Sequence, residues 1–169
     1  MALSMFQSSI PVFIKTLTSL KAILDKGAAH AQAKKIDETV LLQSRLYPDM
    51  LPFTSQVQIA ADQARAGADR IIGSEHATWE DNEKTFAELV ARLDRTITHL
   101  KSLTEKQFDG TESRQITRKV RGEPRTFSGV GYLQQFVLPN LFFHTTTAYA
   151  ILRHNGVELG KLDFLGPLE

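Results

Sequence analysis

The chain has 169 residues, of which 42% are hydrophobic and 23% are charged, and this composition predicts a single folded domain over residues 1–169 rather than a disordered or fibrous chain. Lys and Arg number 20 against 19 Asp and Glu, so the net charge of +1 provides no overall field that would draw the protein to nucleic acid or to an anionic membrane. The absence of cysteine excludes disulfides, thiolate catalysis and Cys-ligated metals.

The first predicted helix runs from residue 3 to about residue 24, where apolar residues recur every three or four positions. Pro11 lies within it, so the helix either begins near Pro11 or is kinked there. Gly27 and the small, polar run up to residue 35 are predicted to end it. The N-terminal residues lack the basic segment and unbroken apolar core of a secretory signal, so we expect a cytoplasmic protein.

The next two predicted helices cover residues 57–72 and residues 86–103. Gly73 suits the left-handed residue that ends the first of them. Its apolar face consists largely of alanine, which lets a neighbouring backbone approach closely or leaves a cavity. Thr78 or Asp81 is the predicted N-cap of the helix that follows.

A small β-hairpin is predicted from residues 116–120 and 125–127, which flank the connection Arg-Gly-Glu-Pro. Five basic residues gather in and beside it, and they suit either a phosphate or acidic partner surface or a solvated turn: Arg114, Arg118, Lys119, Arg121 and Arg125.

The fourth predicted helix begins at Ser128 or Gly129, runs to about Arg153 and stops at Gly156. It is apolar almost all round, as expected for a helix in a bundle interior, but polar interruptions argue against a membrane span. The whole pattern predicts an all-α four-helix bundle with a small β-hairpin insertion before the last helix.

Asn140 and His144 are the polar exceptions in this apolar helix, and their spacing of four places them on one face. Buried polar groups require hydrogen-bond partners, and Gln56, Gln58 and Asp62 on the alanine-rich helix are the candidates. An apolar wall for a ligand pocket would come from Phe136, Phe142, Phe143 and Tyr149. We expect the remaining histidines to be structural or solvated: His30, His76, His99 and His154.

Four segments carry a resemblance to a known family: LYPDM at residues 46–50, QVQIA at 56–60, LPNLFFH at 138–144 and AYAILRHNGVELGK at 148–161. They resemble an uncharacterised domain family grouped with the DinB/YfiT-like bundles, and the resemblance covers essentially the whole chain. It implies a four-helix bundle that is frequently a homodimer. It also implies a divalent metal such as zinc or nickel, held in many relatives by one histidine of the second helix and two of the fourth.

In this sequence those three positions carry Gln56, Asn140 and His144, so His144 is the one candidate metal ligand that is a histidine. Amide oxygens replace imidazoles poorly as zinc or nickel ligands. The leading prediction is therefore a small-molecule-binding protein with a degenerate, histidine-poor metal site in a pocket between the second and fourth predicted helices, its ligand-binding residues being Gln56, Asn140, His144 and Tyr149. The alternatives are a metal-dependent hydrolase or transferase and a structural homodimer without a pocket. Nucleic-acid and membrane partners are not expected.

Overall fold

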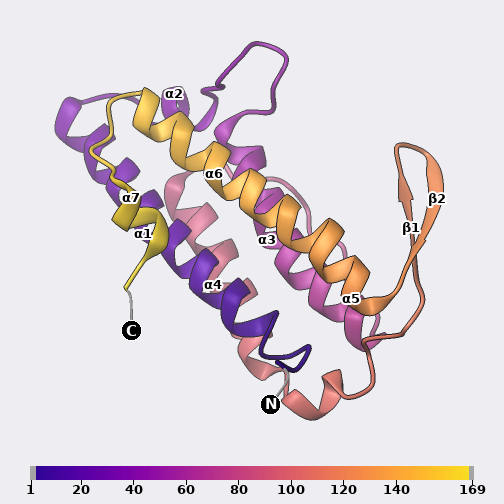
Figure 1. Ribbon diagram of the computed structural model, residues 1–169. Coiled ribbons are helices and arrows are strands. Elements are labelled where there is room, and N and C mark those ends of the chain that lie inside the picture. Colours follow the sequence, from indigo (N-terminus) through magenta and orange to yellow (C-terminus); the bar gives the residue numbers. More distant parts are fainter. Residues whose placement is uncertain (1–2, 168–169) are drawn as a thin grey trace.

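The computed structural model describes residues 3–167, in which four long helices form a bundle (Figure 1). They are α1 (Ile10–Lys34), α3 (Phe53–Ile72), α4 (Phe86–Ser102) and α6 (Leu138–His154). The shorter helices are α2 (Glu38–Leu42), the 3₁₀ turn η1 (Glu105–Phe108), α5 (Gly129–Tyr132) and α7 (Lys161–Leu165). A two-stranded hairpin precedes α5, so the predicted helical bundle with its hairpin insertion is confirmed.

Helix α1 starts with Pro11 in its first turn, where a missing backbone N–H costs no helical hydrogen bond. The prediction that Gly27 ends this helix is wrong, because the helix continues to Lys34 and ends at Lys35, a left-handed residue with a φ of 54°. Gly27 is instead a point of close approach. A Cβ there would lie 2.9 Å from Leu152 Cδ1 and 3.0 Å from Phe86 Cε1.

Helix α3 ends at Gly73, whose φ of 75° confirms the predicted left-handed stop. Its alanines 60, 61, 64 and 68 are fully buried, and α3 packs along α6. Helix α4 begins at Phe86, as predicted, but with a different N-cap. Its N-cap is Thr85, which forms a reciprocal capping box with Glu88, so neither Thr78 nor Asp81 caps it.

The hairpin pairs β1 (Ile116–Val120) with β2 (Glu123–Phe127) in antiparallel register. The turn holds two residues rather than the four predicted, and both have positive φ: Arg121 at 53° and Gly122 at 86°. Two successive left-handed residues match the twist of the strands they join. Pro124 therefore lies inside β2, opposite Lys119.

The predicted fourth helix is continuous in its path but not uniform, since the π-helical stretch η2 (Leu133–Val137) separates α5 from α6. Pro139 follows it in the first turn of α6. A proline lacks the N–H that closes an α-turn and crowds the carbonyl four residues earlier, which a wider π turn accommodates. The helix ends as predicted, with Gly156 left-handed at a φ of 89°.

One apolar core fills the space between the helices and includes the fully buried rings of Phe13, Phe53, Phe86 and Tyr132. Within residues 3–167 the structure has no helix that is both long and apolar enough to span a membrane.

Candidate functional site

The centre of the predicted site is formed by one hydrogen bond between α3 and α6. Gln56 lies in the first turn of α3, is almost fully buried, and accepts through Oε1 from His144 Nδ1 at 2.7 Å. The other end of the amide, Nε2, donates to the carbonyl of Leu51 at 3.0 Å. The structure therefore brings together two of the residues predicted from sequence and ties both to the segment that precedes α3.

This bond determines the tautomer of His144. An amide oxygen only accepts, so Nδ1 carries the proton and Nε2 of the neutral ring keeps its lone pair. Burial of the half-exposed imidazole lowers the pKa of His144, which keeps the ring neutral at pH 7. Across residues 3–167 no protein group hydrogen-bonds to Nε2, so this lone pair is available to a donor from outside the chain.

Asn140 does not join the pair. Its Nδ2 donates to the backbone carbonyl of Phe136, one turn earlier in the same helix, at 2.6 Å. The two amides of the predicted trio thus have separate partners, and the expected three-residue constellation is reduced to Gln56 and His144.

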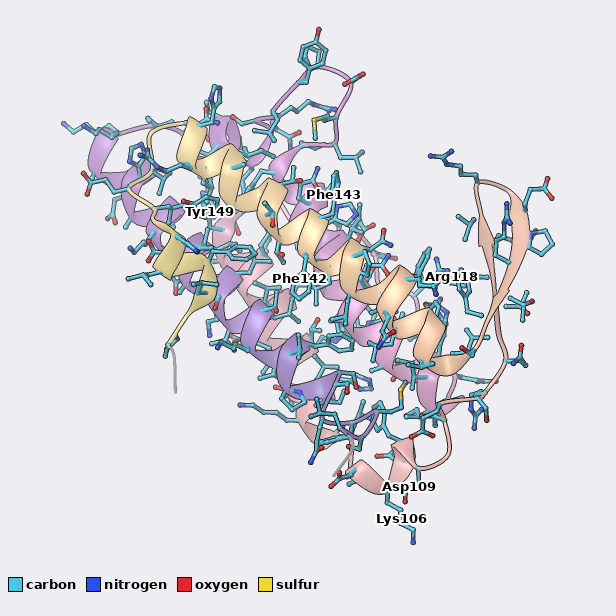
Figure 2. The ribbon with its side chains drawn as sticks, in the orientation of Figure 1. Lys106, Asp109, Arg118, Phe142, Phe143 and Tyr149 are labelled. Atoms are coloured by element: carbon cyan, nitrogen blue, oxygen red, sulfur yellow. The ribbon has the colours of Figure 1, made fainter. Side chains whose placement is uncertain are left out.

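Tyr149 lies on another side of α6, where its side chain points toward α7 (Figure 2). Its ring meets that of Phe164 edge to face with 6.1 Å between centroids. Phe143, by contrast, is the direct neighbour of the site. It is 56% exposed, and its ring stands perpendicular to that of His144 at a centroid distance of 5.2 Å.

The other two candidate partners on α3 bond elsewhere. Gln58 Nε2 donates to Glu83 at 2.8 Å, and Asp62 pairs with Arg65 and Arg92 at 3.2 Å each. Both therefore belong to the opposite flank of α3, toward α4 and residues 73–85.

That flank holds a charge network that the sequence analysis missed. The Arg92 side chain is only 2% exposed and lies within ion-pair distance of three carboxylates, those of Asp62, Asp81 and Glu83, at 2.8 to 3.2 Å. The Arg65 guanidinium lies 4.3 Å from the ring centre of Trp79. A signal was available, because Arg92 lies between Leu89 and Leu93 within the apolar stripe of its helix.

The donor set at the predicted site does not fit a divalent metal. It offers one imidazole nitrogen, while the oxygen of Gln56 already accepts from His144 and the amide of Asn140 bonds its own helix. Zinc and nickel sites in proteins usually have at least three imidazole, thiolate or carboxylate ligands. In the described part of the chain no group of three His, Asp or Glu side chains is arranged to hold a metal ion.

The chain is similar to known proteins over almost its whole length. The family model described as "Domain of unknown function (DUF1993)" matches residues 5–165. A solved structure of a DinB family member protein from Shewanella denitrificans is 41% identical in sequence, with a TM-score of 0.91. The match covers 96% of this chain and 92% of that one. No curated protein matches.

Proposed function

The chain belongs to the DUF1993 family of DinB-like domains, and within it we propose a small-molecule-binding protein whose site lies at the α3–α6 seam around His144. The observation that carries this proposal is the 2.7 Å bond from His144 Nδ1 to Gln56. That bond fixes the tautomer of the imidazole and leaves a single acceptor, Nε2, at a half-buried position.

The surroundings of His144 indicate the chemistry of the ligand. A neutral imidazole acceptor binds a hydroxyl or N–H donor, and the exposed ring of Phe143 beside it offers an apolar contact surface. The ligand we propose is therefore a mainly apolar molecule with one hydrogen-bond donor.

A metal-dependent hydrolase or transferase, the alternative suggested by the family resemblance, lacks support from the donor set described above. We propose that the site works without a metal, because one imidazole and two engaged amides make a poor zinc or nickel site.

The homodimer remains a prediction. Exposed apolar side chains at Leu46, Tyr47 and Leu51 precede α3, and Phe143 is exposed on α6. Gln56 connects these two segments, because it donates to the Leu51 carbonyl and accepts from His144 of α6, so we propose this face as the contact with a second copy. Light scattering of the wild type and of Tyr47→Ser, Phe143→Ser tests it. A monomeric wild type would contradict it.

The binding proposal is tested with phenol, an apolar ring that carries one donor. Titration should move the ¹⁵N resonance of His144 Nε2 in a saturable way, because the phenol hydroxyl bonds that nitrogen. Toluene has nearly the same shape without the hydroxyl and should leave the resonance in place. In His144→Phe, the protein should no longer bind phenol, as judged by saturation-transfer NMR.

Tyr149→Phe is the matched control, since it removes a hydroxyl on the other side of α6. It should bind phenol as the wild type does, whereas loss of binding would return Tyr149 to the site. Equal binding of phenol by His144→Phe, or a protonated Nε2 in the free protein at pH 7, would refute the proposal.

A further inference from the structure

A groove lined by arginines, with neither His144 nor Gln56 in its lining, lies between α3, residues 73–78 and the hairpin strand β1. Two cavities form it, one of about 250 Å³ and one of about 500 Å³. Both are lined by Arg70 and His76. Arg65 and Arg118 line the smaller cavity, and Arg114 lines the larger one.

Most of the positive charge in this groove is not balanced by the protein. Among the described residues, Arg70, Arg114 and Arg118 make no ion pair, unlike Arg92 with its three carboxylates. The acidic side chains of the lining are Asp62 and Glu75. Asp62 is already shared between Arg65 and Arg92, and Glu75 is exposed to solvent.

The hydrogen bond and the pKa of His76 both reflect the excess of positive charge. Arg70 Nη2 lies 2.6 Å from His76 Nε2, and because a guanidinium only donates, that nitrogen accepts and the ring is neutral. Burial lowers the pKa of His76, and the positive charges of Arg70, Arg65 and Arg118 lower it further, with only Asp69 acting in the opposite direction. Three arginines thus act together at one point.

The arginines are held in place while keeping donors free. Arg70 is fixed by His76 and by the carbonyl of Ala66 at 3.2 Å, and the guanidinium of Arg118 lies 5.3 Å from the ring centre of Phe136. Figure 2 shows Arg118 between the hairpin and the helices. In residues 3–167 the side chains of Arg114 and Arg118 donate no hydrogen bond to the protein.

Glycine at position 73 is needed for this arrangement as well as for ending α3. A Cβ on Gly73 would collide with the guanidinium of Arg114, which therefore lies directly over the glycine backbone. Arg118 also faces Arg125 across the hairpin, since the two are register partners. Like charges placed opposite each other destabilise a strand pair, which favours a bound anion.

We propose that this groove binds the phosphate group of a small phosphorylated molecule. Guanidinium groups match phosphate oxygens in a two-pronged geometry, and a phosphate accepts more such donors than a carboxylate does. The smaller cavity admits a phosphate and the larger one the rest of a small metabolite. A nucleic acid fits less well, because the one tryptophan, Trp79, already has the guanidinium groups of Arg65 and Arg95 within 4.3 Å of its ring centre.

The test is calorimetric titration of the full chain with inorganic phosphate at constant ionic strength. Arg114→Gln, Arg118→Gln should weaken phosphate binding by about tenfold to a hundredfold, because two charge-assisted hydrogen-bonding groups are lost. Lys119→Gln, Arg121→Gln removes the same charge from β1 and its turn, outside the groove lining, and should change the Kd by less than about twofold. Circular dichroism melts without phosphate verify that both variants fold.

Three results would overturn the proposal. The first is a wild type that does not bind phosphate at millimolar concentration, and the second is an equal loss of affinity in the two double variants. The third is binding of acetate, or of a single-stranded oligonucleotide through its bases, that is tighter than that of phosphate. Because His144 lies outside the groove, His144→Phe should bind phosphate normally, so this proposal and the seam proposal fail separately.

Discussion

Toward α6, helix α3 buries Gln56 in a neutral bond with His144, whereas toward α4 and residues 73–85 it buries Arg65 beside Arg92 and their acidic partners. The first flank needs two side chains and one backbone carbonyl. The second needs carboxylates from three positions, because an arginine cannot lose its charge when it is buried. The contrast explains why the neutral flank can be closely packed with alanine, while the charged flank keeps a long irregular segment folded over it.

The largest effect is expected from breaking the charged flank with Arg92→Met. This change leaves Asp62, Asp81 and Glu83 facing one another without their common cation, and should lower the free energy of unfolding by about 3 kcal/mol. Urea unfolding followed by circular dichroism measures it. A loss below about 1 kcal/mol would mean that the carboxylates find water easily and that the network is a surface feature.

The pH dependence sharpens the same point. Burial raises the pKa of Glu83, but hydrogen bonds from Arg92 and Gln58 outweigh it, so the folded pKa lies below the ordinary value of 4.5. The stability that Glu83 contributes is therefore present above pH 4.5 and is lost as the pH falls through the lower, folded value. In Arg92→Met, this loss at acid pH should be smaller than in the wild type.

A smaller effect is expected from crowding the neutral flank with Gly67→Ala. The new Cβ would lie 2.7 Å from Val137 Cγ1, inside van der Waals contact, and overpacking should cost about 2 kcal/mol despite the better helix propensity of alanine. The melting temperature measures this. Val137→Ala in the same chain should recover part of the loss, and an absence of coupling between the two changes would contradict the close approach.

A still smaller effect is expected from Gln56→Leu, which removes the partner of His144 and should cost about 1 kcal/mol because the half-exposed ring can bond water instead. Burial lowers the folded pKa of His144 below its ordinary 6.5, so its contribution to stability is full above pH 6.5 and declines as the pH falls toward the folded value. The folded pKa of His76 is also lowered, so the stability that His76 contributes declines over the same pH range. His144→Phe should therefore reduce, but not abolish, the fall in stability below pH 6.5.

The smallest expected effect is that of zinc or nickel. Neither ion should raise the melting temperature, and protein purified without chelators or a histidine tag should contain no stoichiometric metal by elemental analysis, since the donor set is too weak. Stoichiometric metal that disappears in His144→Ala would reverse this interpretation.

The end of α3 and the left-handed stop at Gly73 could be predicted from sequence, because spacing and a glycine after the last apolar residue are local signals, whereas its start at Phe53 lies four residues before the predicted one. Gly27 shows where such local signals fail to predict the end of a helix. It has the same local appearance, yet it continues a helix because Leu152 and Phe86, distant in the chain, need the room. The true N-cap, Thr85, was not among the predicted caps although Glu88 completes its capping box, because Thr78 and Asp81 are capping residue types just as favourable.

The site divides in the same way. The pairing of Gln56 with His144 follows from a buried polar group that needs a partner across a packed interface. The bond from Asn140 to the Phe136 carbonyl could not be predicted in this way. A side-chain bond to the backbone of the same helix competes closely with a bond to a side chain on a neighbouring helix. The arginine groove depends on Arg70 of α3 and Arg118 of β1 being brought together by tertiary packing, which periodicity alone does not reveal.

The π-helical stretch η2 connects the hairpin and α5 to α6, and so sets how the hairpin is oriented about the helix axis. Phe136 within it stacks on Tyr132 at 5.5 Å and contacts Phe127 of the hairpin at 6.0 Å, so the angular position of that widened turn aims the hairpin. A π turn holds roughly one residue more than an α turn, so deleting one of the solvent-facing residues Gln134 or Gln135 would close the turn to a regular α turn and leave the angular position of the hairpin nearly unchanged. The widened turn is thus a place where the chain can lose a residue without moving the arginine groove relative to His144 and its amide partner.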